Sequence, residues 1–275
     1  MMRSIGEKTA QEDFDRSFEE LGLDHIDLVL VHMPLGDVFG TWRVLEQELE
    51  RGRVRAIGVS DFTPARLQDL ISNSAIPPLL DQFQSNPYCA SDEVLSFCQK
   101  QGIAFQAWSP LVHGDDGLFA DLVLESIAAS HGKSIAQVAL LWQLQRGASF
   151  VAESTHPERM RENLDLFGFS LSDDEMKKIS SLARHQTRSF FEEPAFIAHL
   201  SKEWHEDRGR GTCHLPQQEP VGIIWPLSRG HFHVPESPQR LRSVSVEQLW
   251  SKPSSLHHIP HGGICSGGSN GRQHS

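Results

Sequence analysis

Five short apolar segments of this 275-residue chain each end in polar residues whose types suit hydrogen bonding and acid–base chemistry. A histidine titrates near neutrality, while hydroxyl and amide side chains both donate and accept hydrogen bonds. The polar residues at these ends are His32, Ser60, Asp61, Gln82, Trp108, Ser109, Glu153 and Ser154. Such a set can bind a small polar molecule if the fold brings the ends of the segments together.

The apolar segments themselves are predicted to be β-strands, at residues 27–31, 54–59, 79–83, 103–107 and 149–152. Helical spacing and helix-end signals lie around and between them. One helix ends at Gly22, and the others are expected at residues 41–51, 63–71, 91–101, 118–146 with a break near Gly132, and 157–166. Thr63 and Pro64 suit the cap and the first position of their helix, and Ser172 to Glu175 form a capping box that starts a last helix.

Strand–helix units in series predict an α/β fold with a parallel sheet and helices outside it. A doubly wound open sheet and a (β/α)8 TIM barrel are the two candidates. No glycine-rich dinucleotide fingerprint follows any strand, whereas functional groups do follow successive strands, which is the barrel arrangement. The sequence therefore favours an incomplete (β/α)8 barrel with about five of the eight units.

The amino-acid composition of the chain changes near residue 186. Residues 186–275 hold nine of the 15 histidines and eight of the 15 prolines, and no helical or strand period survives at that density. We therefore expect a partial barrel over residues 1–185 and an irregular, disordered tail over residues 186–275. The tail contains Cys213, His214 and further histidines without a recognisable finger spacing, so no metal site is predicted.

Composition excludes several classes of protein. The formal net charge of −11 argues against binding to nucleic acid. The apolar runs are too short to cross a bilayer, and the first residues do not resemble a secretion signal. None of the four cysteines forms a CxxC pair, so we expect reduced thiols and a cytoplasmic protein.

Four segments together resemble the aldo-keto reductase family. The string LGLDHIDLVLVHMP at residues 21–34 is similar to the segment that carries the family's active-site histidine, and GRVRAIGVSDF at 52–62 resembles its Gly-Val-Ser-Asn-Phe element. AWSPL at 107–111 resembles the segment that stacks on the nicotinamide, and ERMRENL at 158–164 resembles the helix that binds the adenosine end. The order and separations match the family over about two thirds of the chain.

The resemblance implies reduction of a small aldehyde or ketone by hydride transfer from NADPH. It gives His32 the catalytic role of orienting the carbonyl. Ser60 and Gln82 would hydrogen-bond the carboxamide of the nicotinamide, and Trp108 would supply the stacking face. The expected cofactor-binding residues are Ser60, Asp61, Gln82, Trp108, Ser109, Leu111, Glu153, Ser154, Thr155, Arg159, Glu162 and Asn163.

The chain also departs from the family pattern at cofactor positions. Asp61 stands where asparagine is usual, and Trp108 replaces the more frequent tyrosine. Glu153 occupies a position where the family commonly has a lysine that meets the 2′-phosphate. A carboxylate there repels NADPH but can accept a hydrogen bond from the ribose hydroxyls of NADH, so NADH is a second candidate cofactor.

The catalytic pattern departs further. Tyr88 is the one tyrosine of the chain and follows the third strand, whereas the family's proton donor, with its lysine and aspartate partners, precedes the histidine. We therefore expect a chain truncated at the N-terminus, with impaired catalysis. A barrel without three strands also leaves edges exposed, which predicts self-association. Two hypotheses follow: an incompletely recorded reductase, or a noncatalytic protein that binds a dinucleotide or a partner.

Overall fold

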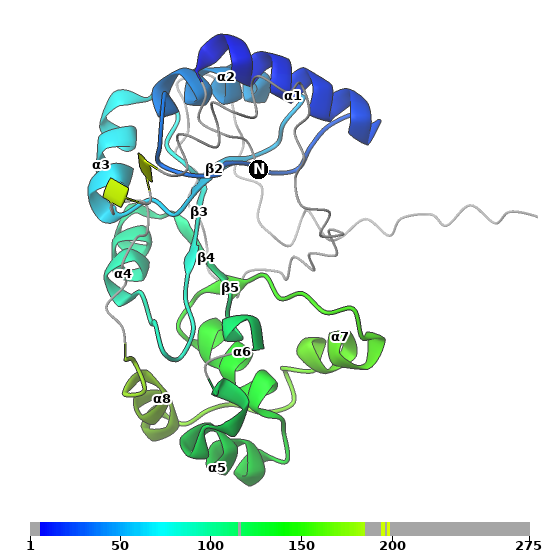
Figure 1. Ribbon diagram of the computed structural model, residues 1–275, viewed down its shortest axis with the longest axis vertical. Coiled ribbons are helices and arrows are strands. Elements are labelled where there is room, and N and C mark those ends of the chain that lie inside the picture. The colour runs from blue at the N-terminus through cyan, green and yellow to red at the C-terminus, as the bar shows by residue number, and fades with distance from the viewer. Residues whose placement is uncertain (1–5, 115–116, 185–193, 196, 199–275) are drawn as a thin grey trace, which may run out of the picture. The chain divides into compact units, whose positions relative to one another are not determined.

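The computed structural model describes residues 6–114, 117–184, 194–195 and 197–198 (Figure 1). The chain divides into two compact units, Met1–Gly230 and His231–Ser275, and all of the described residues belong to the first. The expected irregular tail over residues 186–275 falls almost wholly outside the described residues, so it stays a prediction. No helix in the described part of the chain is long and apolar enough to span a membrane.

Five parallel strands form one sheet, and they lie in the order in which the chain reaches them. The strands are β1 (Val29–Val31), β2 (Ile57–Ser60), β3 (Leu80–Gln84), β4 (Ala104–Trp108) and β5 (Ser149–Phe150). A doubly wound sheet reverses its strand order at a switch point, and this sheet does not. The sequential order is that of a (β/α)8 barrel, of which the described residues supply five strand–helix units.

Each strand is followed by at least one helix (Figure 1). The helix α1 (Glu7–Leu21) precedes the sheet, and α2 (Val38–Glu50), α3 (Pro64–Asn73) and α4 (Asp92–Gln101) follow β1, β2 and β3. The short 3-10 turns η1 (Val112–Gly114) and η2 (Leu118–Ala120) and the helices α5 (Leu122–His131) and α6 (Ile135–Gln145) follow β4. The chain then forms α7 (Pro157–Leu164) after β5 and finally α8 (Asp173–Ser180).

Local signals in the sequence set most of the helix ends. Gly22 and Gly132 both adopt the left-handed conformation that ends a helix, with φ of 60° and 61°. The Ser172 hydroxyl accepts a hydrogen bond from the Glu175 N–H, and the Glu175 side chain accepts one from the Ser172 N–H, which confirms the predicted capping box. Thr63 and Pro64 occupy the predicted cap and first helical positions, but the buried Thr63 hydroxyl makes no capping hydrogen bond and has no partner among the described residues.

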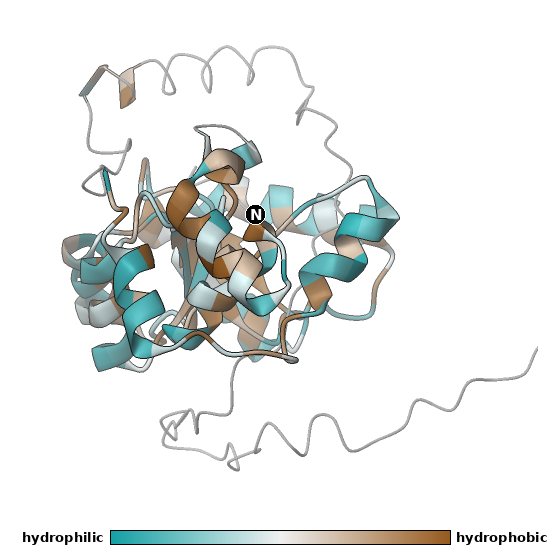
Figure 2. Ribbon diagram, turned by 90° about the horizontal axis from the view of Figure 1, so that it is seen from below, coloured by the Kyte–Doolittle hydropathy of each residue, from teal (hydrophilic) through white to brown (hydrophobic). Residues whose placement is uncertain are grey.

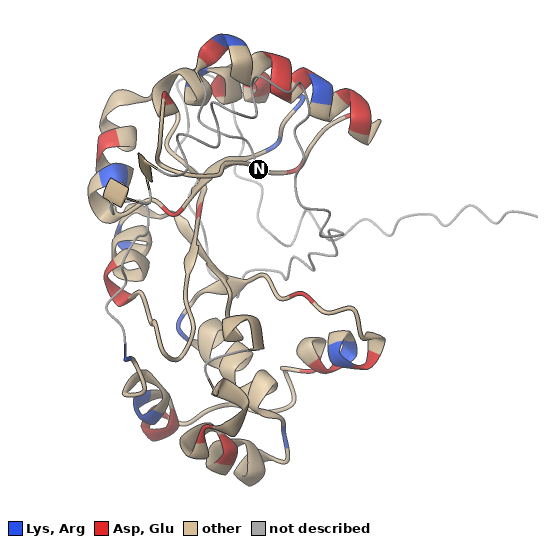
Figure 3. Ribbon diagram, in the orientation of Figure 1, with Lys and Arg blue, Asp and Glu red and all other residues tan. Residues whose placement is uncertain are grey.

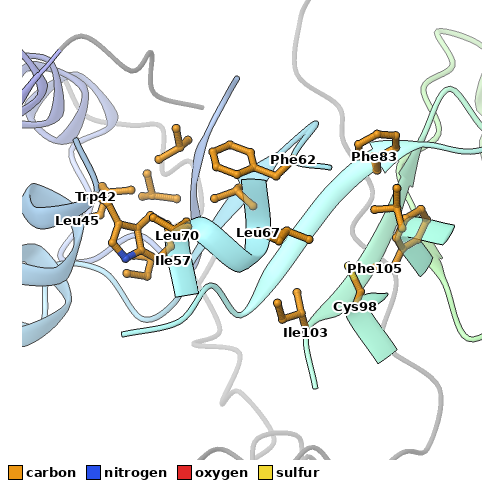
Figure 4. Close-up of a cluster of buried hydrophobic side chains, with 14 of the residues drawn as sticks. Trp42, Leu45, Ile57, Phe62, Leu67, Leu70, Phe83, Cys98, Ile103 and Phe105 are labelled. Atoms are coloured by element: carbon orange, nitrogen blue, oxygen red, sulfur yellow. The ribbon is translucent and has the colours of Figure 1, made fainter. Parts of the chain in front are cut away.

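The face of the sheet that meets the helices holds the largest hydrophobic core. Alternate strand residues point to this face, among them Val31, Val59, Phe83, Phe105 and Phe150. Figure 4 shows Trp42 and Leu45 of α2 with Ile57 at one end of this core, and Phe83 and Phe105 with Cys98 of α4 at the other. Hydrophobic residues in Figure 2 accordingly concentrate on the strands and on one side of the helices. Burial of each such side chain contributes roughly 1.5–3 kcal/mol.

The opposite face of the sheet begins with a short apolar layer. Leu30, Leu80 and Ala104 form a separate buried cluster there, in register across three strands. Gly58 lies between Leu30 and Leu80, and a Cβ at this position would come within 2.5 Å of the Leu80 carbonyl oxygen. Glycine therefore permits the close approach of β2 to its neighbours, and the residues two positions further along the strands face the same side.

A buried ion cluster ties α1 and α2 to the turn before β2. The side chain of Glu48 is fully buried and accepts hydrogen bonds from Arg51 at 2.6 Å, from Gln11 at 3.1 Å and from Arg53. Burial alone would raise the pKa of Glu48, but the hydrogen bonds from Arg53 and Gln11 and the nearby positive charges lower it overall. The cluster therefore stabilises the fold whenever Glu48 is ionised.

We expect E48Q to lower the free energy of unfolding by about 1–2 kcal/mol at neutral pH, because Arg51 and Arg53 lose the negative charge of their buried acceptor. Since the pKa of Glu48 is lowered in the folded chain, its contribution is complete above the ordinary glutamate pKa of 4.5 and disappears as the pH falls through the folded value. Urea unfolding at several pH values measures this difference. E50Q, at an exposed position of the same helix, is the control, and an equal effect of both variants would contradict the account.

Candidate functional site

A row of polar side chains crosses the sheet immediately after the apolar layer. Ser60, Gln82, Gln106 and Ser149 occupy matching positions in β2 to β5, since Ser60 pairs with Gln82, Gln82 with Gln106, and Gln106 with Ser149. His32 follows the last residue of β1, and continuing the register of Val31 with Val59 places it opposite Ser60. The fold therefore puts a polar residue of every strand at one level near the carboxyl end of the sheet.

Within this row the two glutamines are paired. The Gln82 amide nitrogen donates a hydrogen bond of 2.7 Å to the Gln106 amide oxygen, and both side chains are buried. This contact orients the Gln82 amide, so its oxygen remains as an acceptor for a ligand N–H. Gln106 was not among the residues expected from the sequence, although its even spacing along β4 from Trp108 places it on the same face.

Asp61 lies at the turn that follows β2, in a left-handed conformation with φ of 60°. Its backbone N–H donates to the Gln82 carbonyl at 2.9 Å, which fixes the turn against β3. Its carboxylate accepts hydrogen bonds from the Trp108 indole N–H at 2.8 Å and from the Ser60 hydroxyl at 3.4 Å. Burial raises the pKa of Asp61 to about 7, and the two hydrogen bonds limit that rise.

A second carboxyl group, Asp81, is buried next to Asp61 on the face that meets the helices. One of its oxygens accepts a 3.5 Å hydrogen bond from the Phe62 N–H, while the other has no hydrogen-bond partner in the described part of the chain. Burial raises the pKa of Asp81 well above its ordinary value, and the charge of Asp61 adds to the effect. The two aspartates therefore disfavour ionisation at this end of β2 and β3.

The segment after β4 carries three of the predicted residues. Trp108 ends the strand, half-buried, and its ring centroid lies 6.3 Å from that of His113 in the following turn. Ser109 adopts a φ of 52°, and its hydroxyl oxygen is buried with no hydrogen-bond partner among the described residues. Leu111 packs at the margin of the two larger hydrophobic clusters. A buried hydroxyl without a partner indicates that a ligand atom or water completes its hydrogen bonding.

The remaining predicted residues lie on the loop that follows β5 and on α7, which contacts α6. Glu153, Thr155 and Arg159 are exposed, and Ser154, Glu162 and Asn163 are partly exposed. The Ser154 hydroxyl accepts a hydrogen bond from the His156 N–H at 3.1 Å, just before the helix begins. In Figure 3 this helix carries both positive and negative residues. The predicted site residues therefore form two groups, one at the strand ends and one around α7.

The chain's one tyrosine belongs to neither group. Tyr88 is buried in a cluster formed with α5, α6 and α8, its hydroxyl donates to Asp121 at 3.0 Å, and the Arg184 guanidinium lies 4.1 Å from its ring centroid. These contacts give Tyr88 a structural role. In the described part of the chain, no group of three or more histidine, cysteine or acidic residues has the arrangement of a metal site.

Comparison with known proteins identifies the family. The sequence model described as "Aldo/keto reductase family" matches residues 1–184. The chain belongs to this family. It is 40% identical over 182 residues to the glyoxal reductase of Bacillus subtilis, a match that covers 66% of this chain and 65% of that protein. A 9,11-endoperoxide prostaglandin H2 reductase of Trypanosoma cruzi is 40% identical over 171 residues, which are 62% of this chain and 60% of the relative. The chain thus spans less than two thirds of these two reductases.

Solved structures agree with the barrel assignment. The aldo-keto reductase MGS-M4 from a deep-sea metagenome library matches 68% of this chain and 72% of its own, with a TM-score of 0.66 and 33% identity. A Bombyx mori aldo-keto reductase in complex with NADP matches 68% of this chain and 66% of its own, with a TM-score of 0.63 and 30% identity. The parallel sheet of this family member is therefore part of a reductase barrel.

The residues present fit a nicotinamide cofactor at the strand-end group. The Ser60 and Ser109 hydroxyls and the Gln82 amide offer the donors and acceptors that a carboxamide needs, and the Ser109 oxygen lacks any other partner among the described residues. The α7 group fits less well, because Glu153 brings a negative charge to the segment that holds Arg159.

Proposed function

We propose that this chain binds a reduced nicotinamide dinucleotide and supports reduction of a small aldehyde or ketone. The observation that carries the proposal is the row of polar residues on adjacent strands, with the half-buried Trp108 two residues beyond Gln106 on the same face of β4. The similar proteins include a glyoxal reductase and an aldo-keto reductase solved in complex with NADP, which supports the same chemistry. When bound, the cofactor supplies the hydride.

We assign the nicotinamide end to the strand-end group. The Ser60 hydroxyl and Gln82 amide bind the carboxamide, Trp108 supplies the stacking face, and Ser109 and Leu111 line its margin. The pairing of Gln82 with Gln106 supports this assignment, because it leaves the Gln82 oxygen to accept a carboxamide N–H. Asp61 belongs to the same group through its hydrogen bond to Trp108.

We assign the adenosine end to the group around α7. Ser154, Thr155, Arg159, Glu162 and Asn163 bind the adenine and the 2′-phosphate, with the free N–H groups at the helix start. Arg159 is the exposed cation among them and suits a phosphate. Glu153 weakens binding of NADPH and accepts a hydrogen bond from the ribose of NADH, so both cofactors bind.

His32 is the catalytic residue that we assign to the carbonyl. It orients the carbonyl oxygen and can give it a proton, since imidazole titrates near neutrality. Tyr88 does not take part, because its hydroxyl already bonds Asp121 inside a separate hydrophobic cluster. General acid catalysis contributes roughly 10²–10⁴ in rate. Because Tyr88 does not donate the proton, we expect these 275 residues to reduce carbonyls slowly.

We further propose a cytoplasmic protein that associates with a second copy of itself. Cys89 and Cys98 are buried thiols, as in a reducing compartment. Among the described residues β1 pairs with β2 alone and β5 with β4 alone, so both outer strands have a free hydrogen-bonding edge for another chain. Light scattering of the purified chain tests this: a dimer or larger species supports association, and a monomer at all concentrations contradicts it.

The cofactor proposal is tested by titrating the chain's tryptophan fluorescence with NADPH and with NADH. We expect saturable quenching by both. R159A should weaken NADPH binding about tenfold, because one charge-assisted hydrogen bond contributes roughly 1.5–3 kcal/mol, and should change NADH binding less.

R16A is the matched control, since Arg16 is also exposed but lies on α1 and pairs with Asp13. Quenching without carbonyl reduction would support the second hypothesis, that the chain binds a dinucleotide without catalysis. The position of Tyr88, whose hydroxyl bonds Asp121, favours that outcome. A folded chain that neither nucleotide quenches would refute the proposal.

A further inference from the structure

Two departures from the family pattern come together in space. Asp61 directly follows β2 and Trp108 ends β4, 47 residues later, and the indole N–H of Trp108 donates a 2.8 Å hydrogen bond to the Asp61 carboxylate. An indole can only donate, and an ionised carboxylate can only accept. The aspartate therefore supplies the hydrogen-bond acceptor that the indole N–H of the tryptophan requires.

The acceptor is held rigidly. Asp61 is 7% exposed and its backbone is anchored by the 2.9 Å hydrogen bond from its N–H to the Gln82 carbonyl. The second carboxylate oxygen accepts from the Ser60 hydroxyl at 3.4 Å. Both oxygens thus have donors, and the turn cannot shift without breaking its contact with β3.

The donor, Trp108, has few other hydrogen-bond or ring contacts among the described residues. Trp108 is half-buried at the strand end, and its described ring contact is with the exposed His113, at 6.3 Å between centroids and 40° between planes. A tryptophan side chain has several staggered orientations, and the partner of its single N–H favours one of them. That partner is Asp61.

We propose that Asp61 is a positioning residue, which holds the Trp108 indole in the orientation that receives the nicotinamide. The inference rests on the proposed function, in which Trp108 is the stacking face. In this proposal Asp61 acts through Trp108, since each carboxylate oxygen is directed at a neighbouring side chain, one at the indole and the other at the Ser60 hydroxyl. A fixed indole loses less conformational freedom on binding than a mobile one, and this raises affinity.

The first test is the indole N–H resonance of Trp108 in the free chain, assigned by its loss in W108F. D61A should move this resonance upfield and speed its hydrogen exchange, because the acceptor is gone. D61N retains a carbonyl oxygen and should restore most of the protection. A resonance that D61A leaves unchanged would overturn the inference, and this measurement needs no cofactor.

The second test is NADPH affinity from calorimetry of the same variants, each checked by circular dichroism for folding. D61A and W108F should each weaken binding about tenfold, and the double variant should bind no worse than either, since both remove one shared interaction. D61N should restore binding to within about threefold of the original chain.

The outcomes separate the two proposals. If the unmodified chain binds no NADPH, the proposed function itself fails. If it binds and D61A leaves the affinity unchanged, or if the two single losses simply add in the double variant, the positioning role is overturned while the function stands. Failure of D61N to restore binding would also overturn it, because the carboxylate would then meet the cofactor directly.

Discussion

E153K is expected to tighten NADPH binding by roughly ten- to a hundredfold and to weaken NADH binding by about tenfold, because the hydrogen bond from the ribose to Glu153 is lost. Glu153 is exposed and directly precedes Ser154 and Thr155, which we assign to the 2′-phosphate. The substitution removes a repulsion and adds an attraction. Each is worth about 1 kcal/mol at 4 Å in water and more in partly shielded surroundings.

Competitive titrations with the two nucleotides at low and high salt measure this effect. The gain should shrink as salt rises, because exposed charges are screened. E125K is the control, a charge reversal at an exposed position of α5 that should change neither affinity. Equal tightening of NADPH and NADH by E153K would contradict the placement of the 2′-phosphate beside this residue.

D61N is expected to stabilise the chain at alkaline pH and to have little effect in acid. The ordinary pKa of this carboxyl is 3.8, and burial raises it to about 7 in the folded chain. Between these values the folded state holds a proton that the unfolded state has released, so the stability of the original chain falls as the pH rises. The raised pKa corresponds to an upper limit of ~4 kcal/mol, which asparagine avoids since it carries no charge.

Two further effects of D61N also stabilise the folded chain. Removal of the Asp61 charge also eases ionisation of Asp81, whose pKa that charge helps to raise. Asparagine moreover tolerates the left-handed backbone at this turn. Urea unfolding near pH 5 and near pH 8 measures the difference, with D69N on the exposed side of α3 as control. A stabilisation of D61N that is the same at both pH values would contradict the shifted pKa.

The fold was largely predictable from the sequence because its signals are local. Apolar runs of strand length, helical spacing and caps such as Gly22, Gly132 and Ser172 lie within a few residues of each other, and the structure confirms the elements that they predicted. Thr63 shows the limit of such signals: it stands at the cap position, but its hydroxyl has no partner in the described part of the chain. A cap requires a side-chain orientation that residue type alone does not fix.

The partnerships within the site were not predictable, because they join distant positions. The pairing of Gln82 with Gln106 depends on the register of β3 with β4, and the bond from Trp108 to Asp61 crosses an intervening strand. The family resemblance supplied the individual positions Asp61 and Trp108. Only the structure shows that these two side chains are hydrogen-bonded to each other, because two unusual residue types in a sequence can equally be unrelated.

The raised pKa of Asp81 was equally hidden from the sequence. Its strand residues alternate between the two faces of the sheet, and Asp81 falls on the face that packs against helices, where it is fully buried. Asp81 lies in the middle of the strand predicted at residues 79–83, and only the register with Phe105 shows that its side chain is in the core. Burial, not residue type, determines its protonation.

The most direct test of the central claim is a calorimetric titration of the whole purified chain with NADPH, after circular dichroism has established that it is folded. The strand-end row and the α7 group together predict saturable binding, which R159A weakens from the adenosine end and W108F from the nicotinamide end. Binding that both variants reduce would support one dinucleotide site formed by both groups. A folded chain that gives no binding heat, or one whose affinity neither variant changes, would contradict it.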